Sequence, residues 1–185
     1  KDGGTAMMTS PDHPTGTDRL AEVAAAYPEM DLVINVQGDE PLIEPSLIDE
    51  LAAVFEGAED LSMATVMTPM EDPEEQQDPS NVKVVTDKRG YALYFSRSLL
   101  PYPRYAGRAA VYKHIGIYAY RRAFLLQYAK MAPTPLEEAE SLEQLRALEN
   151  GYSIRVIRTD RPFVGVDTPE DLARVNAIYR ERGIP

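Results

Sequence analysis

Apolar positions along this 185-residue chain alternate between strand-like and helix-like spacings for most of its length. In the first third, the pattern predicts short strands at 5–9, 31–36 and 62–67. Helices are predicted at 17–27 and within EPSLIDELAAVFEG, residues 44–57, where a proline opens the helix and a glycine follows its end. A β-α-β-α-β order predicts an α/β fold with a parallel sheet, whose ligands lie outside the carboxyl ends of the strands.

The spacing of apolar residues changes in the rest of the chain. Residues 68–80 are acidic and contain prolines, which predicts a loop. Alternation on both sides of Gly90 predicts a β-hairpin with the glycine in its turn. The remaining predicted elements are a long strand at 109–120, a short helix at 121–131, one helix over 134–151, a strand at 153–158 and a last helix from Thr168 to about Arg182.

Composition narrows the possible partners. The formal net charge is −11, which argues against a nucleic-acid surface but permits a nucleotide bound through a metal ion. The chain has no cysteine, so disulfides and thiolate chemistry are excluded. No apolar stretch approaches the length of a membrane span. A cytoplasmic protein without a membrane partner is therefore expected.

Two aspartates each end an apolar, strand-like stretch. Asp39 ends VINVQGD, and Asp167 ends FVGVD. A turn residue and a helix cap would explain them individually. Carboxylates at the carboxyl ends of strands in one parallel sheet would instead converge, and Mg²⁺ takes one or two carboxylates together with phosphate oxygens. The pair therefore suggests a metal–nucleotide site.

Polar side chains on predicted core faces are further candidates. Glu143 falls on a partly apolar stripe of its predicted helix, where it must be paired or face a ligand, and Gln144 lies roughly a quarter-turn away. His114 and Tyr118 share one face of the long strand, and Gly116 between them leaves room for a ligand. The alternatives are a salt bridge within the fold for Glu143 and a half-buried aromatic strand, such as one at a dimer contact, for His114 and Tyr118.

The last candidates for ligand binding are a basic residue and a segment rich in hydroxyl groups. Arg97 ends an alternating strand and could bind a carboxylate through two hydrogen bonds. The stretch HPTGTDRL, residues 13–20, could approach an anion or a base edge, although a helix start capped by Thr15 or Thr17 would explain it as well.

Taken together, these motifs resemble the 3-deoxy-manno-octulosonate cytidylyltransferase (CMP-Kdo synthetase) family. The resemblance rests on HPTGTDRLAEV, VINVQGDEPLI, NVKVVTDKRGYALYFSR, HIGIYAYR, PLEEAESLEQLR and GVDTPEDLARV, which follow one another in the family's order and cover nearly the whole chain. It implies a Rossmann-like nucleotidyltransferase sheet with helices on both faces. It also implies a homodimer in which residues 82–120 form a β-rich sugar-binding and dimerisation subregion of a single domain over 1–185.

The implied reaction transfers CMP from CTP to the 2-hydroxyl of the eight-carbon sugar acid Kdo, releasing pyrophosphate, for lipopolysaccharide assembly. The resemblance assigns Mg²⁺ to Asp39 and Asp167. It places six residues around the sugar acid: Gln37, Arg97, His114, Tyr118, Glu143 and Gln144. Arg97 would bind the sugar's carboxylate. Four residues would approach the nucleotide: Gly16, Thr17, Arg19 and Gly38.

The chain departs from the family's pattern at its start. No Arg-, Gly- and Lys-rich triphosphate loop precedes Lys1, and about two β-α units, on the order of 60 residues, are expected to be missing. The expectation is a gap beside a central strand and a poorly stable, nearly inactive chain. The alternatives are a cytidylyltransferase for 8-amino-Kdo or sialic acid, and a non-catalytic domain that binds sugar or dimerises.

Overall fold

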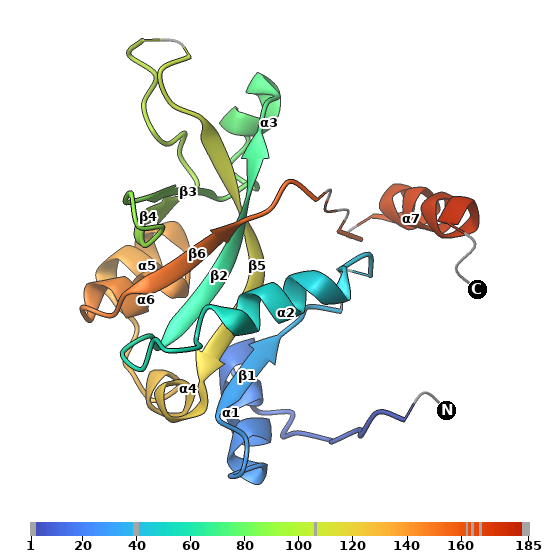
Figure 1. Ribbon diagram of the computed structural model, residues 1–185, viewed down its shortest axis with the longest axis vertical. Helices are drawn as coiled ribbons and strands as arrows, with labels where there is room; N and C mark the ends of the chain where they lie inside the picture. Colours follow the sequence, from blue (N-terminus) through green and yellow to red (C-terminus); the bar gives the residue numbers. More distant parts are fainter. Residues whose placement is uncertain are drawn as a thin grey trace.

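The computed structural model describes residues 3–38, 41–105, 107–161, 163, 165–166 and 168–182. The elements along the chain (Figure 1) are α1 Gly16–Ala26, β1 Leu32–Asn35, α2 Pro45–Ala53, β2 Met63–Met70, α3 Pro73–Gln77, β3 Lys83–Thr86, β4 Ala92–Ser96, β5 Val111–Arg121, α4 Arg122–Tyr128, α5 Pro135–Glu140, α6 Gln144–Glu149, β6 Ile154–Arg158 and α7 Pro169–Arg182. Every helix of the described residues is too short or too polar to cross a bilayer.

A six-stranded mixed sheet forms the centre of the molecule, in the order β4-β3-β5-β2-β6, and β1 also pairs with β5. β1, β2 and β3 all run antiparallel to β5, while β2 and β6 are parallel neighbours. The expectation of a parallel sheet is therefore wrong for most neighbouring pairs. β1 and β2 do run in the same direction, but the 11-residue β5 lies between them.

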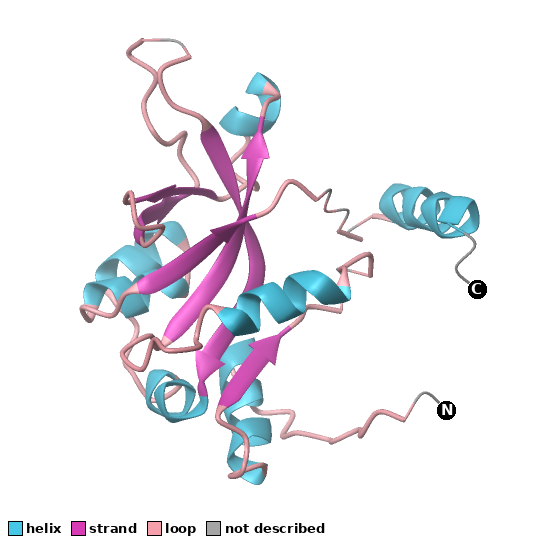
Figure 2. Ribbon diagram, in the orientation of Figure 1, coloured by secondary structure: helices cyan, strands magenta, loops and turns pink. Residues whose placement is uncertain are grey.

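Helices cover both faces of this sheet (Figure 2), as expected. One hydrophobic cluster combines Met63 and Tyr120 with residues of α1, α4 and α6. The other combines Ala64 and Ala119 with residues of α2. Successive strand residues point to opposite faces, so these two clusters are the two layers of the core. The β3–β4 hairpin and β5, expected as a β-rich subregion, are continuous with the main sheet, and residues 98–105 and 107–110 extend beyond it as parts of a long loop (Figure 1).

Three predicted elements differ from the structure. Residues 5–9 form no strand; Met8 is 94% exposed, and a strand needs a partner that this segment does not find. Residues 68–80, expected as a loop, contain the end of β2 and the short helix α3. The single helix expected over 134–151 is two helices, α5 and α6, separated at Ser141, whose φ of 52° and ψ of 49° are left-handed.

Tertiary contacts explain the break at Ser141. Arg97 donates from its guanidinium to the backbone oxygens of Glu140 (2.7 Å) and Ser141 (3.3 Å). In a continuous helix these carbonyls would accept hydrogen bonds from the next turn. The Glu140 carboxylate in turn accepts from the Ser96 hydroxyl and the Arg97 backbone N–H. β4 therefore holds the α5–α6 junction open, which the local sequence of that helix does not reveal.

Lys83 is a fully buried cation that secures the same region. Its ammonium donates to the backbone oxygens of Asp78 (2.9 Å), Asn81 (2.6 Å) and Arg97 (2.6 Å), and burial lowers its pKa. Replacing Lys83 by Met keeps the length of the side chain but leaves these carbonyls without their donor. We expect Lys83→Met to reduce the free energy of unfolding by about 3 kcal/mol, measured by urea titration.

The matched control is Lys88→Met, which removes an exposed ammonium in the hairpin turn between β3 and β4. It should leave the urea midpoint nearly unchanged. Equal effects of the two substitutions would show that the three carbonyl contacts of Lys83 do not stabilise the fold.

Candidate active site

A cavity of about 270 Å³ opens at the end of β1, against the face of β5 that carries the even-numbered aromatic residues. Its walls are formed by Gln37, Met63, Gly116, Tyr118, Tyr120, Tyr128, Glu143 and Gln144. Four of these are predicted sugar-site residues: Gln37, Tyr118, Glu143 and Gln144. Gly116 has open space where a Cβ would project, as its position between His114 and Tyr118 predicts. Residues that follow β1 or lie in β5 and α6, far apart in sequence, thus meet at one site.

Glu143 is held from two directions. The Thr17 hydroxyl donates to its Oε2 at 2.8 Å, and the Tyr128 hydroxyl donates to its backbone oxygen at 2.6 Å. Oε1 is buried and accepts no hydrogen bond among the described residues. The nearest cation is the Arg146 guanidinium, 3.6 Å from Oε1, but it also pairs with Glu137. Burial raises the pKa of Glu143, while the Thr17 bond opposes that rise.

Gln144 supplies the complementary group. Its side chain is buried, and its Nε2 finds no acceptor in the described part of the chain. Buried polar atoms normally have partners, so unpaired ones beside a cavity mark a place for a ligand. An acceptor on Glu143 and a donor on Gln144, each without a hydrogen bond among the described residues, suit a ligand rich in hydroxyl groups.

Tyrosines form one wall of the cavity. Tyr118 stacks on Tyr120 with ring centroids 5.8 Å apart, and Tyr120 stacks on Tyr128 at 6.3 Å. Burial holds the pKa of all three phenols above the ordinary value, so they are protonated donors at neutral pH. The sequence reasoning missed two of them. Continuing the alternation from 114 to 118 would have found Tyr120, but nothing in the sequence of α4 marks Tyr128.

His114 lies next to the cavity, beyond Tyr118, whose ring centroid is 5.3 Å away. Its Nε2 is 3.0 Å from the Thr65 hydroxyl, which donates to the backbone oxygen of Ile117 at 2.8 Å. Because that hydroxyl has one proton, the His114 proton belongs on Nε2 and Nδ1 is an acceptor. Burial lowers the pKa of His114 to about 3, so the imidazole is neutral.

Arg97 lies apart from the other predicted sugar ligands. Its guanidinium donates to three backbone oxygens, those of Pro79, Glu140 and Ser141, and it lines a second cavity of about 580 Å³ with Ser98 and Tyr102. The structure thus gives Arg97 a clear part in holding the α5–α6 junction. Its expected contact with a carboxylate stays a prediction.

The predicted nucleotide residues cluster at the start of α1 and the end of β1. Gly16 and Gly38 are exposed, and Arg19 contacts the Thr9 hydroxyl. Thr15 caps α1 by accepting from the Asp18 backbone N–H, which confirms one of the two caps considered for this helix. Thr17 is buried and directs its hydroxyl to Glu143.

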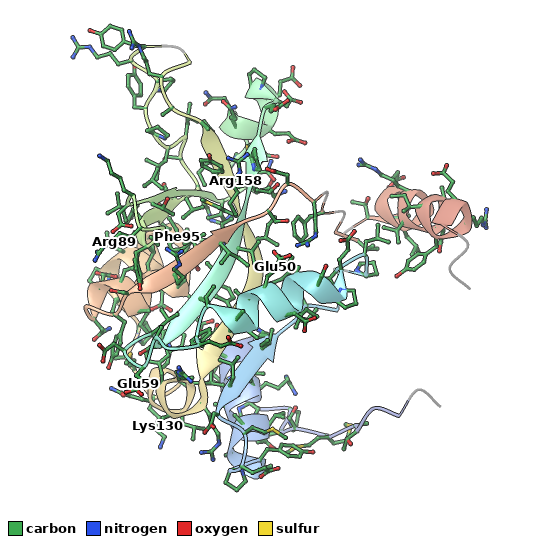
Figure 3. All side chains as sticks on the ribbon, viewed as in Figure 1. Glu50, Glu59, Arg89, Phe95, Lys130 and Arg158 are labelled. Atoms are coloured by element: carbon green, nitrogen blue, oxygen red, sulfur yellow. The ribbon has the colours of Figure 1, made fainter. Side chains whose placement is uncertain are left out.

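The predicted metal ligands Asp39 and Asp167 lie outside the described residues, and the described residues contain no other group of three potential ligands. Two sets of contacts join the segment that follows Asp39 to the last part of the chain. The Tyr179 hydroxyl of α7 donates to the Pro41 oxygen at 2.6 Å. Arg161 forms ion pairs with Glu44 (3.0 Å) and with Glu50 (2.6 Å), which projects from α2 (Figure 3).

Comparison with known proteins gives a consistent result. A family model described as cytidylyltransferase matches residues 1–155. The 3-deoxy-manno-octulosonate cytidylyltransferase of Fusobacterium nucleatum is 53% identical over 182 residues, which are 98% of this chain and 74% of the relative. The enzyme of that name from Geotalea uraniireducens is 56% identical over 186 residues, covering 94% of this chain and 73% of the relative.

A solved structure of CMP:2-keto-3-deoxy-manno-octonic acid synthetase complexed with CTP superposes with a TM-score of 0.92 and 45% identity. The match covers 97% of this chain and 74% of that one. A glucose-1-phosphate thymidylyltransferase from Bacillus anthracis, at 14% identity and a TM-score of 0.59, shares the fold. On these matches and on the site described above, the chain belongs to the cytidylyltransferase family, among the 3-deoxy-manno-octulosonate cytidylyltransferases.

Proposed function

We propose that this chain transfers CMP from CTP to the sugar acid Kdo, with release of pyrophosphate. The observation that carries the proposal is that Glu143 Oε1 and Gln144 Nε2 are buried and make no hydrogen bond among the described residues, and that both side chains line a cavity walled by tyrosines. An acceptor, a donor and protonated phenols together match a polyhydroxylated sugar. The names and the bound CTP of the related proteins support the nucleotide half of the reaction.

In this reaction the sugar's 2-hydroxyl attacks the α-phosphorus of CTP. The new bond joins that oxygen to the α-phosphorus, and the bond to the bridging oxygen breaks as pyrophosphate leaves. Such phosphoryl chemistry depends mainly on positioning and on neutralising charge. Glu143, Gln144 and Tyr118 would hold the sugar's hydroxyl groups, so that its 2-hydroxyl faces the nucleotide at the end of β1.

A divalent metal, expected to be Mg²⁺, fits the donor set of the proposed site. Asp39 precedes Pro41 by two residues and Asp167 precedes α7 by two, and the Tyr179 hydroxyl, ten residues into α7, donates to the Pro41 oxygen. Two carboxylates together with phosphate oxygens of the nucleotide suit Mg²⁺. When bound, the metal would neutralise phosphate charge and polarise the α-phosphate.

The proposal includes a homodimer in the cytoplasm, as the sequence predicts. β5 pairs with other strands on both of its edges. A second copy of the chain therefore cannot add a strand to β5 along its paired residues. Residues 98–105, which precede β5, offer a surface instead, with Tyr102 83% and Tyr105 69% exposed.

The test is pyrophosphate release from CTP and Mg²⁺ with Kdo, with 8-amino-Kdo, with sialic acid and without an acceptor. We expect release with Kdo and only background release with sialic acid or no acceptor. Faster turnover of 8-amino-Kdo or of sialic acid would identify that sugar, in place of Kdo, as the acceptor. Sugar binding by calorimetry without any release would support a non-catalytic sugar-binding domain.

A further inference from the structure

Thr17 has a contact that its place in a helix start does not require. The cap of α1 is supplied by Thr15, which leaves the Thr17 hydroxyl free for another role. Thr17 is only 5% exposed, and its hydroxyl donates at 2.8 Å to Glu143, 126 residues along the chain. This bond joins α1, on the expected nucleotide side, to α6, on the sugar side.

The bond engages one of the two oxygens of the Glu143 carboxylate. Oε2 accepts from Thr17, and Oε1 remains buried without a hydrogen bond. The neighbouring guanidinium of Arg146 cannot orient the carboxylate alone, because it is committed to Glu137 through two nitrogens. The Tyr128 hydroxyl restrains the backbone of Glu143 but not its side chain. In the described part of the chain, Thr17 is thus the one hydrogen-bond donor to this carboxylate.

We propose that Thr17 is a positioning residue for the acceptor sugar: its hydroxyl orients the Glu143 carboxylate so that Oε1 accepts a hydrogen bond from a sugar hydroxyl. This inference rests on the proposed function and deepens it. It assigns Thr17 to the sugar half of the site in place of the nucleotide half expected from the sequence.

The test compares Thr17→Val, which keeps the branched shape but loses the hydroxyl, with Thr17→Ser, which keeps the hydroxyl. Loss of a hydrogen bond to a charged group costs a factor on the order of 10 to 100. We expect Thr17→Val to raise the KM for Kdo about tenfold or more and to leave the KM for CTP within about twofold. Thr17→Ser should restore most of the affinity for Kdo.

The matched control is Thr15→Val, which removes the cap of the same helix without contacting Glu143. It should lower the thermal midpoint but leave the KM for Kdo unchanged. If Thr17→Val instead raises the KM for CTP, Thr17 contacts the nucleotide and the inference is wrong. An unchanged KM for both substrates rejects it as well.

Direct calorimetry separates this inference from the proposed function. If the unsubstituted chain releases no pyrophosphate but binds Kdo, the proposed reaction fails, and weaker Kdo binding by Thr17→Val alone still supports the positioning role. If the unsubstituted chain neither turns over nor binds Kdo, both proposals are rejected. Thermal melts of each variant identify any that fail to fold, and Thr17→Ser then provides the comparison.

Discussion

Replacement of Asp39 by asparagine is expected to lower the rate of pyrophosphate release by a factor on the order of 100 to 1,000. The substitution keeps the size of the side chain but replaces an anionic metal ligand with a neutral one. A metal ion on a phosphoryl group contributes several kcal/mol of charge stabilisation in the transition state, and each 1.4 kcal/mol is about tenfold in rate. Titration with Mg²⁺ at saturating CTP would measure the loss.

A suitable control for this variant is Asp49→Asn, ten residues further along the chain on the exposed side of α2. It removes the same charge from the same region and should leave both the rate and the Mg²⁺ dependence unchanged. Full activity in Asp39→Asn at ordinary Mg²⁺ would remove Asp39 from the proposed metal site. Partial recovery at high Mg²⁺ would support its assignment as a ligand.

Replacement of Glu143 by glutamine should change binding and stability in opposite directions. The amide cannot present the anionic acceptor that the cavity contains, and we expect kcat/KM for Kdo to fall by about 100-fold. Burial of the charged carboxylate opposes folding, which is why the pKa of Glu143 lies above its ordinary value. The variant should therefore melt up to about 3 °C higher near pH 8.

The pH dependence of the melting temperature follows from the raised pKa of Glu143. Because the folded chain binds the Glu143 proton more tightly than the unfolded chain does, this carboxyl lowers stability as the pH rises through its raised pKa. Below its ordinary pKa of 4.5 the carboxyl is neutral in both states and the penalty is absent. The difference in melting temperature between the variant and the unsubstituted chain should thus shrink as the pH falls from 8 toward 4.5.

Glu138→Gln serves as the control because Glu138 is an exposed carboxylate on the neighbouring α5. Its melting temperature should differ from that of the unsubstituted chain by a similar amount at every pH. A constant difference for Glu143→Gln as well would show that the partly buried Glu143 carboxylate carries no folding penalty.

Much of the candidate site could be predicted from the sequence. The family motifs named Gln37, Tyr118, Glu143 and Gln144, and the structure brings them to one cavity. Strand periodicity alone placed Gly116 and Tyr118 on the same face. The contact between Thr17 and Glu143 could not be predicted, because neither periodicity nor a local motif links two residues 126 positions apart.

The sequence by itself determined which segments become strands and helices in most of the chain, because the spacing of apolar residues reports which face of a segment is buried. It does not report which neighbour covers that face. Only the tertiary structure decided that β5 enters the sheet between β1 and β2, and that Arg97 divides α5 from α6. Only the fold decided which buried polar atoms found partners, and it left Glu143 Oε1 and Gln144 Nε2, in two side chains that line the cavity, without a hydrogen bond among the described residues.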